Sequence, residues 1–564
     1  MADGFATPSR ALAPARLRIA KMNSPEYDVA IIGGGHNGLT CAAYLAQAGL
    51  SVIVLEKNDA AGGAAVTQEF HPGFRNSVAA YAVSLLHPKV IRDLELERHG
   101  LKLIERPAAN FWPIDHRRSL LMPYDLTGRR HAIAAFSSTD AARLPAYETA
   151  LERAASVLRD LALRTPPNAG GGLGELVRGA GLGRRLVGLG VEDQRLLVDL
   201  FTKSAADFLA QWFESGVVQG AFAFDGIVGA YASPYTPGTA YVLLHHCFGE
   251  VNGKRGVWGH ALGGMGAITQ AMHRSAETAG ARVRTAAPVA ALLLAGGRTR
   301  GVRLSSGEEI PARAVAAGVP PKLLFRDLVP EDAVAPEVRR RFLGLKSGSG
   351  TFRMNVALAE LPDFRCRPGT QAQEHHGSGI IIGPTLGYLD RAYLDARRHG
   401  WSLEPVVEML IPSTIDATLS PPGRHVASLF VQHVAPHLPE GRSWEDAREK
   451  EAFADLVIAT VAAYAPNFTT SVIARQVLSP LDLERHFGLV DGDIFHGQMS
   501  LDQLFSARPV LGFANYRMPV AGLYLCGAGA HPGGGVTGLP GHNAAREIIK
   551  DFRRWRGLGR RVEF

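Results

Sequence analysis

A strand–turn–helix–strand pattern near the N-terminus constrains the fold more than any other feature of the sequence. Tyr27–Ile32 is an apolar run of strand length, and the glycines of Gly33-x-Gly35-x-x-Gly38 follow it directly. Residues 39–48 then carry apolar side chains at helical spacing, and residues 51–55 form a second apolar run that Glu56 ends. The order of strand, glycine turn, helix, strand and acid predicts a nucleotide-binding βαβ unit.

Each residue type in this unit has a physical task. Glycine permits the backbone angles of a tight turn and lets a pyrophosphate approach the main chain. The helix begins directly after the turn, so its free N–H groups and its dipole face the two phosphates. Glu56 lies 18 residues beyond Gly38 and can accept hydrogen bonds from the hydroxyls of an adenosine ribose, which favours FAD or NAD over NADP. The predicted contacts of this unit are Gly33, Gly34, Gly35, His36, Asn37, Gly38, Glu56 and Lys57.

Length and composition describe a globular chain with more than one folding unit. The 564 residues suggest about two to four units, and the hydrophobic content of 46% supplies a large core. We expect no transmembrane helix, because no uninterrupted apolar run reaches about 18 residues. The net charge of +7 is modest, and basic and aromatic residues do not interleave over a sustained stretch. We therefore expect no nucleic-acid partner.

Cysteine usage argues against a metal site and against a dithiol enzyme. Cys41, Cys247, Cys366 and Cys526 lie far apart in the sequence, and their spacing fits neither a zinc site nor a closely spaced redox pair. We predict no metal and interpret the four side chains as small buried apolar groups. A reducing compartment follows, which is the cytoplasm, or the mitochondrial matrix if the source is eukaryotic.

A second glycine turn follows Glu56, and with this turn the sequence resembles one particular superfamily. The runs GGGHNGLTCAAYLAQAG at 33–49, GGAAVT at 62–67 and HPGF at 71–74 resemble the phytoene-desaturase-type superfamily of FAD-dependent oxidoreductases. The resemblance is greatest to its branch called pyridine nucleotide-disulfide oxidoreductase domain-containing protein 2. It implies FAD as the cofactor, with further contacts from Gly62, Gly63, Ala64 and Ala65.

The stretch GLYLCGAGAHPGGGVTGLPGHNAAREII at 522–549 carries the same resemblance near the C-terminus. Gly533-x-Gly535-x-x-Gly538 repeats the fingerprint spacing, but too little chain remains for a second nucleotide-binding unit. A glycine turn that opens a helix is still an anion-binding nest. The resemblance implies that Gly527 and Ala528 contact the pyrophosphate and ribityl chain. It also implies contacts to the flavin ring from Gly534, Gly535, Val536 and Thr537, and a backbone contact to the adenine from Val289.

These patterns predict an α/β fold in which a Rossmann-type FAD-binding domain is interleaved with an α+β substrate domain that has a sheet floor and a helical cap. A chain that leaves and re-enters its nucleotide domain is expected of the superfamily. The FAD-binding domain is predicted at 27–100, 251–334 and 516–564, the last with a basic tail. The substrate domain is predicted at 101–250, which includes the cap, and at 335–515. Residues 1–26 are predicted to be a flexible leader, with an organelle transit segment as the alternative.

Three further segments of the middle and the tail carry predictions, and two of them leave an alternative open. Helices are predicted over 138–164 and 192–213, and the glycine-rich run 172–190 between them is predicted to be a solvated loop, with a membrane-surface contact as the alternative. The adjacent residues His245, His246 and Cys247 are expected to diverge on a strand and to bind no metal. The basic tail, which includes Arg560 and Arg561, suits a solvated helix or a peripheral membrane contact.

One fingerprint and one glycine nest fit a single FAD and leave no unit for NAD(P)H. The flavin would therefore take electrons from a substrate and pass them to oxygen or a quinone. Hydride removal leaves an adjacent proton for a nearby base. His531, beside the predicted ring contact, is the one candidate for this catalytic base, although a hydrogen-bonded loop histidine is the preferred interpretation.

The leading functional hypothesis is hydride removal from an apolar, carotenoid- or lipid-like small molecule by C–C desaturation. The substrate class comes from the resemblance, whereas the residues themselves indicate only the flavin. Amine oxidation and redox-neutral isomerisation are alternative reactions for this fold. A flavin-stabilised interaction protein with little turnover is a further alternative, because cofactor binding and catalysis are separable.

Overall fold

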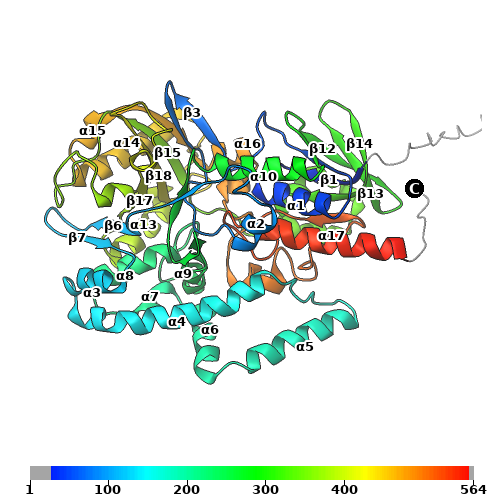
Figure 1. Ribbon diagram of the computed structural model, residues 1–564, viewed down its shortest axis with the longest axis horizontal. Helices are drawn as coiled ribbons and strands as arrows, with labels where there is room; N and C mark the ends of the chain where they lie inside the picture. Colours follow the sequence, from blue (N-terminus) through cyan, green and yellow to red (C-terminus); the bar gives the residue numbers. More distant parts are fainter. Residues whose placement is uncertain (1–26, 558–564) are drawn as a thin grey trace, which may run out of the picture.

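The computed structural model describes residues 27–557, and two seven-stranded sheets organise this part of the chain (Figure 1). The predictions made for the leader 1–26 and for Arg560 and Arg561 lie outside the described residues. The fold is mixed α/β, as the sequence predicts. None of the helices within 27–557 combines the length and the apolar character that crossing a bilayer requires.

The first sheet joins strands from widely separated parts of the chain. Its order is β11-β2-β1-β14-β13-β12, with β20 beside β14, and the strands β11, β2, β1, β14 and β20 run parallel. The strands β2, β1 and β20 are almost wholly apolar and buried, which suits parallel strands covered on both faces, whereas the edge strand β11 is Arg-Val-Arg. The bounds are β1 Tyr27–Ile32, β2 Val52–Leu55, β11 Arg282–Arg284, β12 Val289–Ala295, β13 Arg298–Leu304, β14 Glu309–Ala317 and β20 Leu523–Leu525.

Three helices cover the first sheet close to the N-terminal glycine turn. The helix α1 (His36–Gln47) contacts both α10 (Gly266–Thr278) and α17 (Leu539–Gly557), and Figure 1 shows the three side by side. Glycine makes the contact between α1 and α17 possible, because a Cβ on Gly541 would lie 2.1 Å from the carbonyl oxygen of Asn37. The C-terminal helix is thereby held against the start of the N-terminal one.

The second sheet has the order β19-β15-β18-β17-β16-β6-β7, and every pair in it is antiparallel except β16 with β6. Side chains alternate between its faces. Val407 and Met409 face the core formed with α14 (Ala447–Tyr464), whereas Val406 belongs to the core on the opposite face. The bounds are β6 Asn110–Pro113, β7 Ser119–Met122, β15 Phe352–Leu358, β16 Gly379–Ile382, β17 Trp401–Leu410, β18 His425–Val434 and β19 Val472–Leu478.

A layer of helices covers that opposite face of the second sheet (Figure 1). Its members are α3 Leu126–Ala134, α4 Ser138–Ala162, α5 Leu173–Val187, α6 Val191–Thr202, α7 Ala205–Ala210, α8 Gly216–Ala223, α9 Thr239–His246 and α13 Leu386–His399. The remaining helices are α2 Pro88–Asp93, α11 Pro321–Leu323, α12 Pro336–Leu343, α15 Phe468–Ser471 and α16 Pro480–Phe487. Short two-stranded pairs are β3 Thr67–His71 with β4 Phe74–Ser77, β5 Leu103–Glu105 with β10 Gly259–Ala261, and β8 Glu250–Val251 with β9 Lys254–Arg255.

The helical layer confirms one sequence-based expectation and corrects three. The helix predicted over 138–164 is present as α4. The zone 192–213 forms two helices, because Ser204 interrupts it and its hydroxyl caps α7 by accepting from the Asp207 amide at 3.0 Å. The glycine-rich run 172–190, predicted to be a loop, forms α5, whose side chains Leu182 and Leu186 pack against the core of the layer. His245 and His246 lie on the helix α9 rather than on a strand.

Candidate functional site

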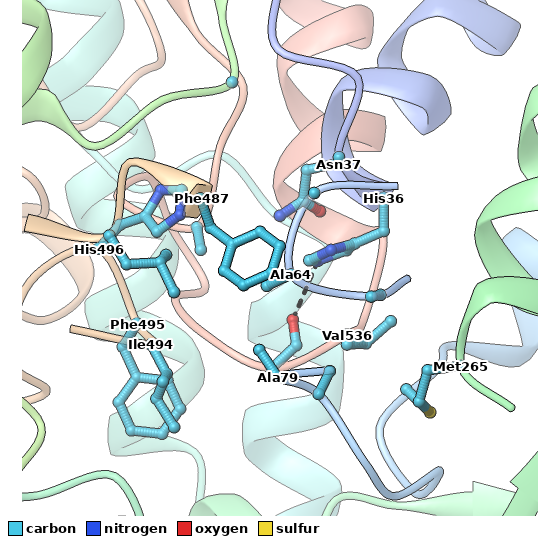
Figure 2. Close-up of a pocket in the computed structure, with 18 of the residues that line it drawn as sticks. His36, Asn37, Ala64, Ala79, Met265, Phe487, Ile494, Phe495, His496 and Val536 are labelled. Carbon is cyan, nitrogen blue, oxygen red and sulfur yellow. Dashed lines mark hydrogen bonds between the residues drawn. The ribbon is translucent and has the colours of Figure 1, made fainter. Parts of the chain in front are cut away.

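A cavity of about 320 Å³ joins the glycine turns of the first sheet to the second sheet. Residues from both sheets and from the helical layer line it, among them Ile32, Phe224 and Phe430. Fourteen of the residues predicted to bind the cofactor lie in its wall, and Figure 2 shows part of this arrangement. They are Gly33, Gly35, His36, Asn37, Gly38, Glu56, Lys57, Gly63, Ala64, Ala65, Val289, Ala528, Gly535 and Val536.

We call the end of the cavity formed by residues 33–38, 56, 62–65 and 533–538 the cradle. Its first turn is set by backbone contacts that exclude side chains. A Cβ on Gly38 would lie 2.1 Å from the carbonyl oxygen of Gly33, and the Gly62 amide donates to the Gly34 carbonyl at 2.9 Å. The helix α1 begins at His36 without a side-chain cap, so its first N–H groups remain for an anion.

Glu56 closes the cradle at the end of β2. One carboxylate oxygen accepts from the Gly34 amide at 2.8 Å, and the other accepts from the Asn58 amide at 3.0 Å. The side chain is buried yet lines the cavity. These two bonds hold the carboxylate beside the glycine turn, which is where the hydroxyls of a ribose would need an acceptor.

The two ends of the chain meet at the cradle. The Nε2 atom of His36 lies 3.2 Å from the carbonyl oxygen of Gly535, although 499 residues separate them. Burial lowers the pKa of His36 to about 4, so the ring is neutral at pH 7 and donates this hydrogen bond. In Figure 2, His36 points toward the segment that carries Val536. The N-terminal and C-terminal glycine turns are therefore parts of one site.

The cradle fits an elongated dinucleotide. The Asn37 side chain is 3% exposed, and neither its amide nitrogen nor its amide oxygen has a hydrogen-bond partner within the described residues. A buried amide of this kind has a donor and an acceptor available for a ligand. Together with the uncapped start of α1 and the carboxylate of Glu56, it provides groups for phosphate and for ribose.

Five of the predicted cofactor-binding residues do not line the cavity but shape its wall. Gly34 and Gly62 bond to each other through their backbones. A Cβ on Gly527 would lie 2.4 Å from the Gly318 carbonyl oxygen, and one on Gly534 would lie 1.9 Å from the Phe495 ring. The Thr537 hydroxyl accepts from the Leu539 amide at 3.0 Å and so caps the start of α17.

We call the opposite end of the cavity the inner wall. The register of the second sheet places Arg353, Phe430 and Glu408 opposite one another on β15, β18 and β17, which puts all three on one face. Tyr81 stacks on Phe430 with ring centroids 5.2 Å apart, and the Arg353 guanidinium lies 4.5 Å over the Tyr81 ring. The Tyr81 hydroxyl donates a short hydrogen bond to the Glu408 carboxylate.

The inner wall contains two acidic side chains whose pKa values are raised and, close to them, two buried guanidinium groups. Burial raises the pKa of Glu408, and Arg106, the Tyr81 hydroxyl and Arg353 oppose that rise. Burial also raises the pKa of Asp225, to about 7, and the nearby Glu408 adds to the rise. The guanidinium groups of Arg106 and Arg353 belong to residues that are only 5% and 1% exposed. Each has nitrogen atoms without a hydrogen-bond partner in the described residues. Glu408 is thus the carboxyl group that two buried cations help to ionise.

His531, the candidate catalytic base from the sequence, is not among the residues that line the cavity. Its Nε2 atom lies 3.0 Å from the carbonyl oxygen of Leu161, and burial lowers its pKa to about 4. The hydrogen-bonded loop histidine is therefore the interpretation that its position favours.

Sequence reasoning did not select Tyr81, Asp225 or Glu408, although each lines the cavity. A usable signal was present for the two acids. Glu408 is a lone charge in the apolar strand PVVEML, and Asp225 is a lone charge in the run FAFDGIVGAY. Charged side chains are almost never buried without a partner or a function.

Comparison with known proteins identifies similar chains over nearly the whole length. Residues 38–351 match the family model described as flavin containing amine oxidoreductase. The pyridine nucleotide-disulfide oxidoreductase domain-containing protein 2 of Mus musculus is 41% identical over 549 residues and covers 94% of each chain. The phytoene desaturase (lycopene-forming) of Pantoea ananas is 24% identical and covers 91% of this chain and 96% of its own.

Solved structures show the same fold at low sequence identity. A structure of putrescine oxidase bound to putrescine has a TM-score of 0.56 and 16% identity, over 94% of this chain and 99% of that chain. A likeness at this identity concerns the fold and not the substrate.

Proposed function

Since the chain belongs to the family of flavin-containing amine oxidoreductases and its cofactor is FAD, we propose that it removes hydride from an apolar substrate by C–C desaturation. Family and cofactor confirm the expectations drawn from the motifs. The reaction and the substrate are the proposal. The proposed reaction is supported by the similarity to a protein that is named phytoene desaturase.

The observation that carries the proposal is one cavity with two unlike ends. The cradle offers backbone amides, an amide side chain and a carboxylate to the cofactor. Beyond it the wall is largely aliphatic and aromatic, with Val83, Phe224, Val228, Phe430 and Phe495 among its residues. A chamber of this kind favours an apolar substrate and keeps water away from it.

Bound FAD would supply an acceptor for a hydride, which is two electrons and one proton. Desaturation also releases a proton from the neighbouring carbon, and the electron pair of that C–H bond becomes the new C=C bond. Glu408 is the group in the inner wall that we assign to accept this proton, on a carboxylate oxygen. A carboxylate whose pKa burial has raised is a stronger base than an exposed one.

The neighbours of Glu408 suit it to this role. The Tyr81 hydroxyl holds the carboxylate by a hydrogen bond, and its ring contacts both Arg353 and Phe430. Arg106 and Arg353 favour the ionised form of this carboxylate and oppose part of the rise that burial causes in its pKa. Oxygen or a quinone would then reoxidise the flavin.

The test is anaerobic reduction of the yellow protein. We expect polyenes or apolar lipids to bleach the flavin absorbance, and amines to leave it unchanged. The Glu408→Gln variant should retain FAD and bleach at least about 100-fold more slowly, as expected for loss of a general base. Its control is Glu404→Gln on the same strand, where the side chain is exposed.

Each alternative reaction predicts a different result in this experiment. Bleaching by amines alone would replace desaturation with C–N oxidation. Conversion of a substrate without net bleaching would indicate an isomerase. Bleaching by none of the three classes, together with a stable protein partner, would favour an interaction protein. Admission of air or of a quinone to the bleached protein then identifies the electron acceptor.

A further inference from the structure

The most exposed large apolar side chains of residues 27–557 are concentrated in one stretch, 173–198. The most exposed such residue elsewhere in this part of the chain is Leu394, at 55%. Single exposed apolar residues are normal on a protein surface, but a group of them marks an interaction site. The six residues are Leu173 at 82%, Val187 at 77%, Val177 at 71%, Leu176 at 67%, Val191 at 61% and Val198 at 60%.

The helix α5 has two apolar faces, and only one of them is covered. Leu182 and Leu186 pack against the core of the helical layer. At about 100° per residue, Leu173, Leu176, Val177 and Val187 fall within an arc of roughly 100° on the opposite side. Figure 1 shows α5 at the outer margin of the helical layer, on the side away from both sheets. We call these four residues the outer face of α5.

The glycines of α5 are not required by packing within the chain. A Cβ added to Gly174, Gly181 or Gly183 would meet no atom within 4 Å. Glycine lowers helix stability relative to alanine, and no atom of the described chain occupies the space that a side chain would fill at these three positions. Small residues beside the outer face leave its leucines and valines as the most prominent groups. Such a helix gains stability when a partner covers this face.

The charges and the residue types on α5 indicate what that partner is. The helix carries Arg178, Arg184 and Arg185 against the single acid Glu175, and Arg184 lies within the arc of the outer face. The outer face has aliphatic side chains and no aromatic ones, whereas protein interfaces are anchored mainly by aromatic residues. Leucine on one side of a helix that is also rich in arginine is typical of helices that lie on lipid.

We propose that the outer face of α5 docks on the surface of an anionic lipid bilayer. The four aliphatic side chains enter the boundary between headgroups and acyl chains, and Arg184 contacts lipid phosphates. Arg178 and Arg185 also form ion pairs, with Glu175 at 2.8 Å and with Asp160 at 2.6 Å. Both arginine side chains are exposed, at 39% and 44%, so these pairs compete weakly with phosphate. The docking is independent of the flavin reaction.

The experiment is flotation of the full-length, FAD-loaded protein with two kinds of vesicle. One contains phosphatidylcholine alone, and the other contains phosphatidylcholine and phosphatidylglycerol at about seven to three. We expect binding to the anionic vesicles that weakens as salt is added. Changing the outer face with Leu173→Ser, Leu176→Ser, Val177→Ser and Val187→Ser together should lower the bound fraction at least ten-fold.

Two single variants test the same proposal if the fourfold variant folds poorly. The single change Leu176→Ser should weaken binding several-fold, and Arg184→Glu should weaken it on anionic vesicles only. The matched control is Leu394→Ser, which removes an exposed leucine on α13 and should change nothing. FAD content and melting temperature establish that each variant is folded.

Three results would overturn the proposal. The first is that the wild-type protein floats with neither vesicle. The second is binding that the outer-face variants leave unchanged, which would assign it to another part of the chain. The third is self-association by analytical ultracentrifugation that the same variants abolish, because the occupant of the outer face would then be a second copy of this chain.

Discussion

The cradle and the inner wall are two ends of one cavity, and they are built in opposite ways. In the cradle the shape comes from the backbone: Gly38 lets the Gly33 carbonyl approach the start of α1, and the Gly62 amide donates to the Gly34 carbonyl. In the inner wall the shape comes from side chains, with Glu408 and Tyr81 brought together over 327 residues of sequence. The cradle, which is shaped by main-chain atoms, tolerates no added side-chain atoms. The inner wall, which is shaped by side chains, tolerates substitution, but its function depends on each polar contact.

The largest effect is expected from the smallest added group in the cradle. Gly38→Ala places a methyl group 2.1 Å from the Gly33 carbonyl oxygen, so the turn must open. We expect FAD affinity to fall at least about 100-fold, or about 2.7 kcal/mol, measured by flavin fluorescence titration of the apoprotein. The control Gly174→Ala meets no atom within 4 Å and should leave FAD affinity unchanged. Normal affinity in Gly38→Ala would contradict a cradle set by backbone contact.

A smaller loss is expected from Glu56→Gln. Both carboxylate oxygens accept from backbone amides, and glutamine presents a donor to one of them. A hydrogen bond to a charged group contributes about 1.5–3 kcal/mol, so FAD should bind roughly ten-fold to 100-fold more weakly. Equilibrium dialysis measures this, with the exposed Glu97→Gln as the control. Flavin that does bind should still be reduced at the normal rate, because the inner wall is unchanged.

The contrast between the two ends also explains what the sequence could predict. The cradle depends on local rules: a glycine turn needs glycine, and an acid after the second strand needs only its spacing. These rules located the fingerprint 33–38, Glu56 and the second turn at 62–65 without any knowledge of tertiary contacts. Fourteen predicted contacts line the cavity because the motif and the site are the same stretch of chain.

The inner wall could not be predicted in the same way. Arg353, Phe430 and Glu408 meet because β15, β18 and β17 pair in one register, and no local pattern fixes that register. The helix α5 was missed for a related reason. Its glycines predict a loop, and only the tertiary contacts of Leu182 and Leu186 show why it is a helix. Tertiary packing overrode propensity there.

Titrating groups at the two ends should change the free energy of unfolding with pH in opposite directions. Burial lowers the pKa of His36 to about 4 and that of His245, beside Gly535, to about 3. The unfolded value is near 6.5, so this stability is complete above pH 6.5 and is lost as pH falls toward 3–4. Burial raises the pKa of Asp225 to about 7. Its contribution is complete below pH 3.8 and is lost as pH rises to 7.

Urea unfolding of the apoprotein from pH 4 to 8 measures these contributions. Each group adds a slope of up to about 1.4 kcal/mol per pH unit within its window. His245→Gln should make the slope of the unfolding free energy against pH less positive below pH 6.5, and Asp225→Asn should make it more positive between pH 4 and 7. A change of slope in the same direction in both variants would show that the two ends do not differ in this respect.

The smallest effect is expected from Tyr81→Phe, because this change removes one hydroxyl and keeps the ring. Stacking on Phe430 and the contact with the Arg353 guanidinium both persist, so the loss is the hydrogen bond to Glu408. We expect stability to fall by about 1–2 kcal/mol, with FAD affinity unchanged. The exposed Tyr235→Phe is the control. Without the donated hydrogen bond the pKa of Glu408 rises further, so the pH needed for flavin reduction should move upward. If Tyr81→Phe lost FAD as readily as a cradle variant, the ring of Tyr81 would belong to the cofactor site, and the division of the cavity into two ends would have to be redrawn around it.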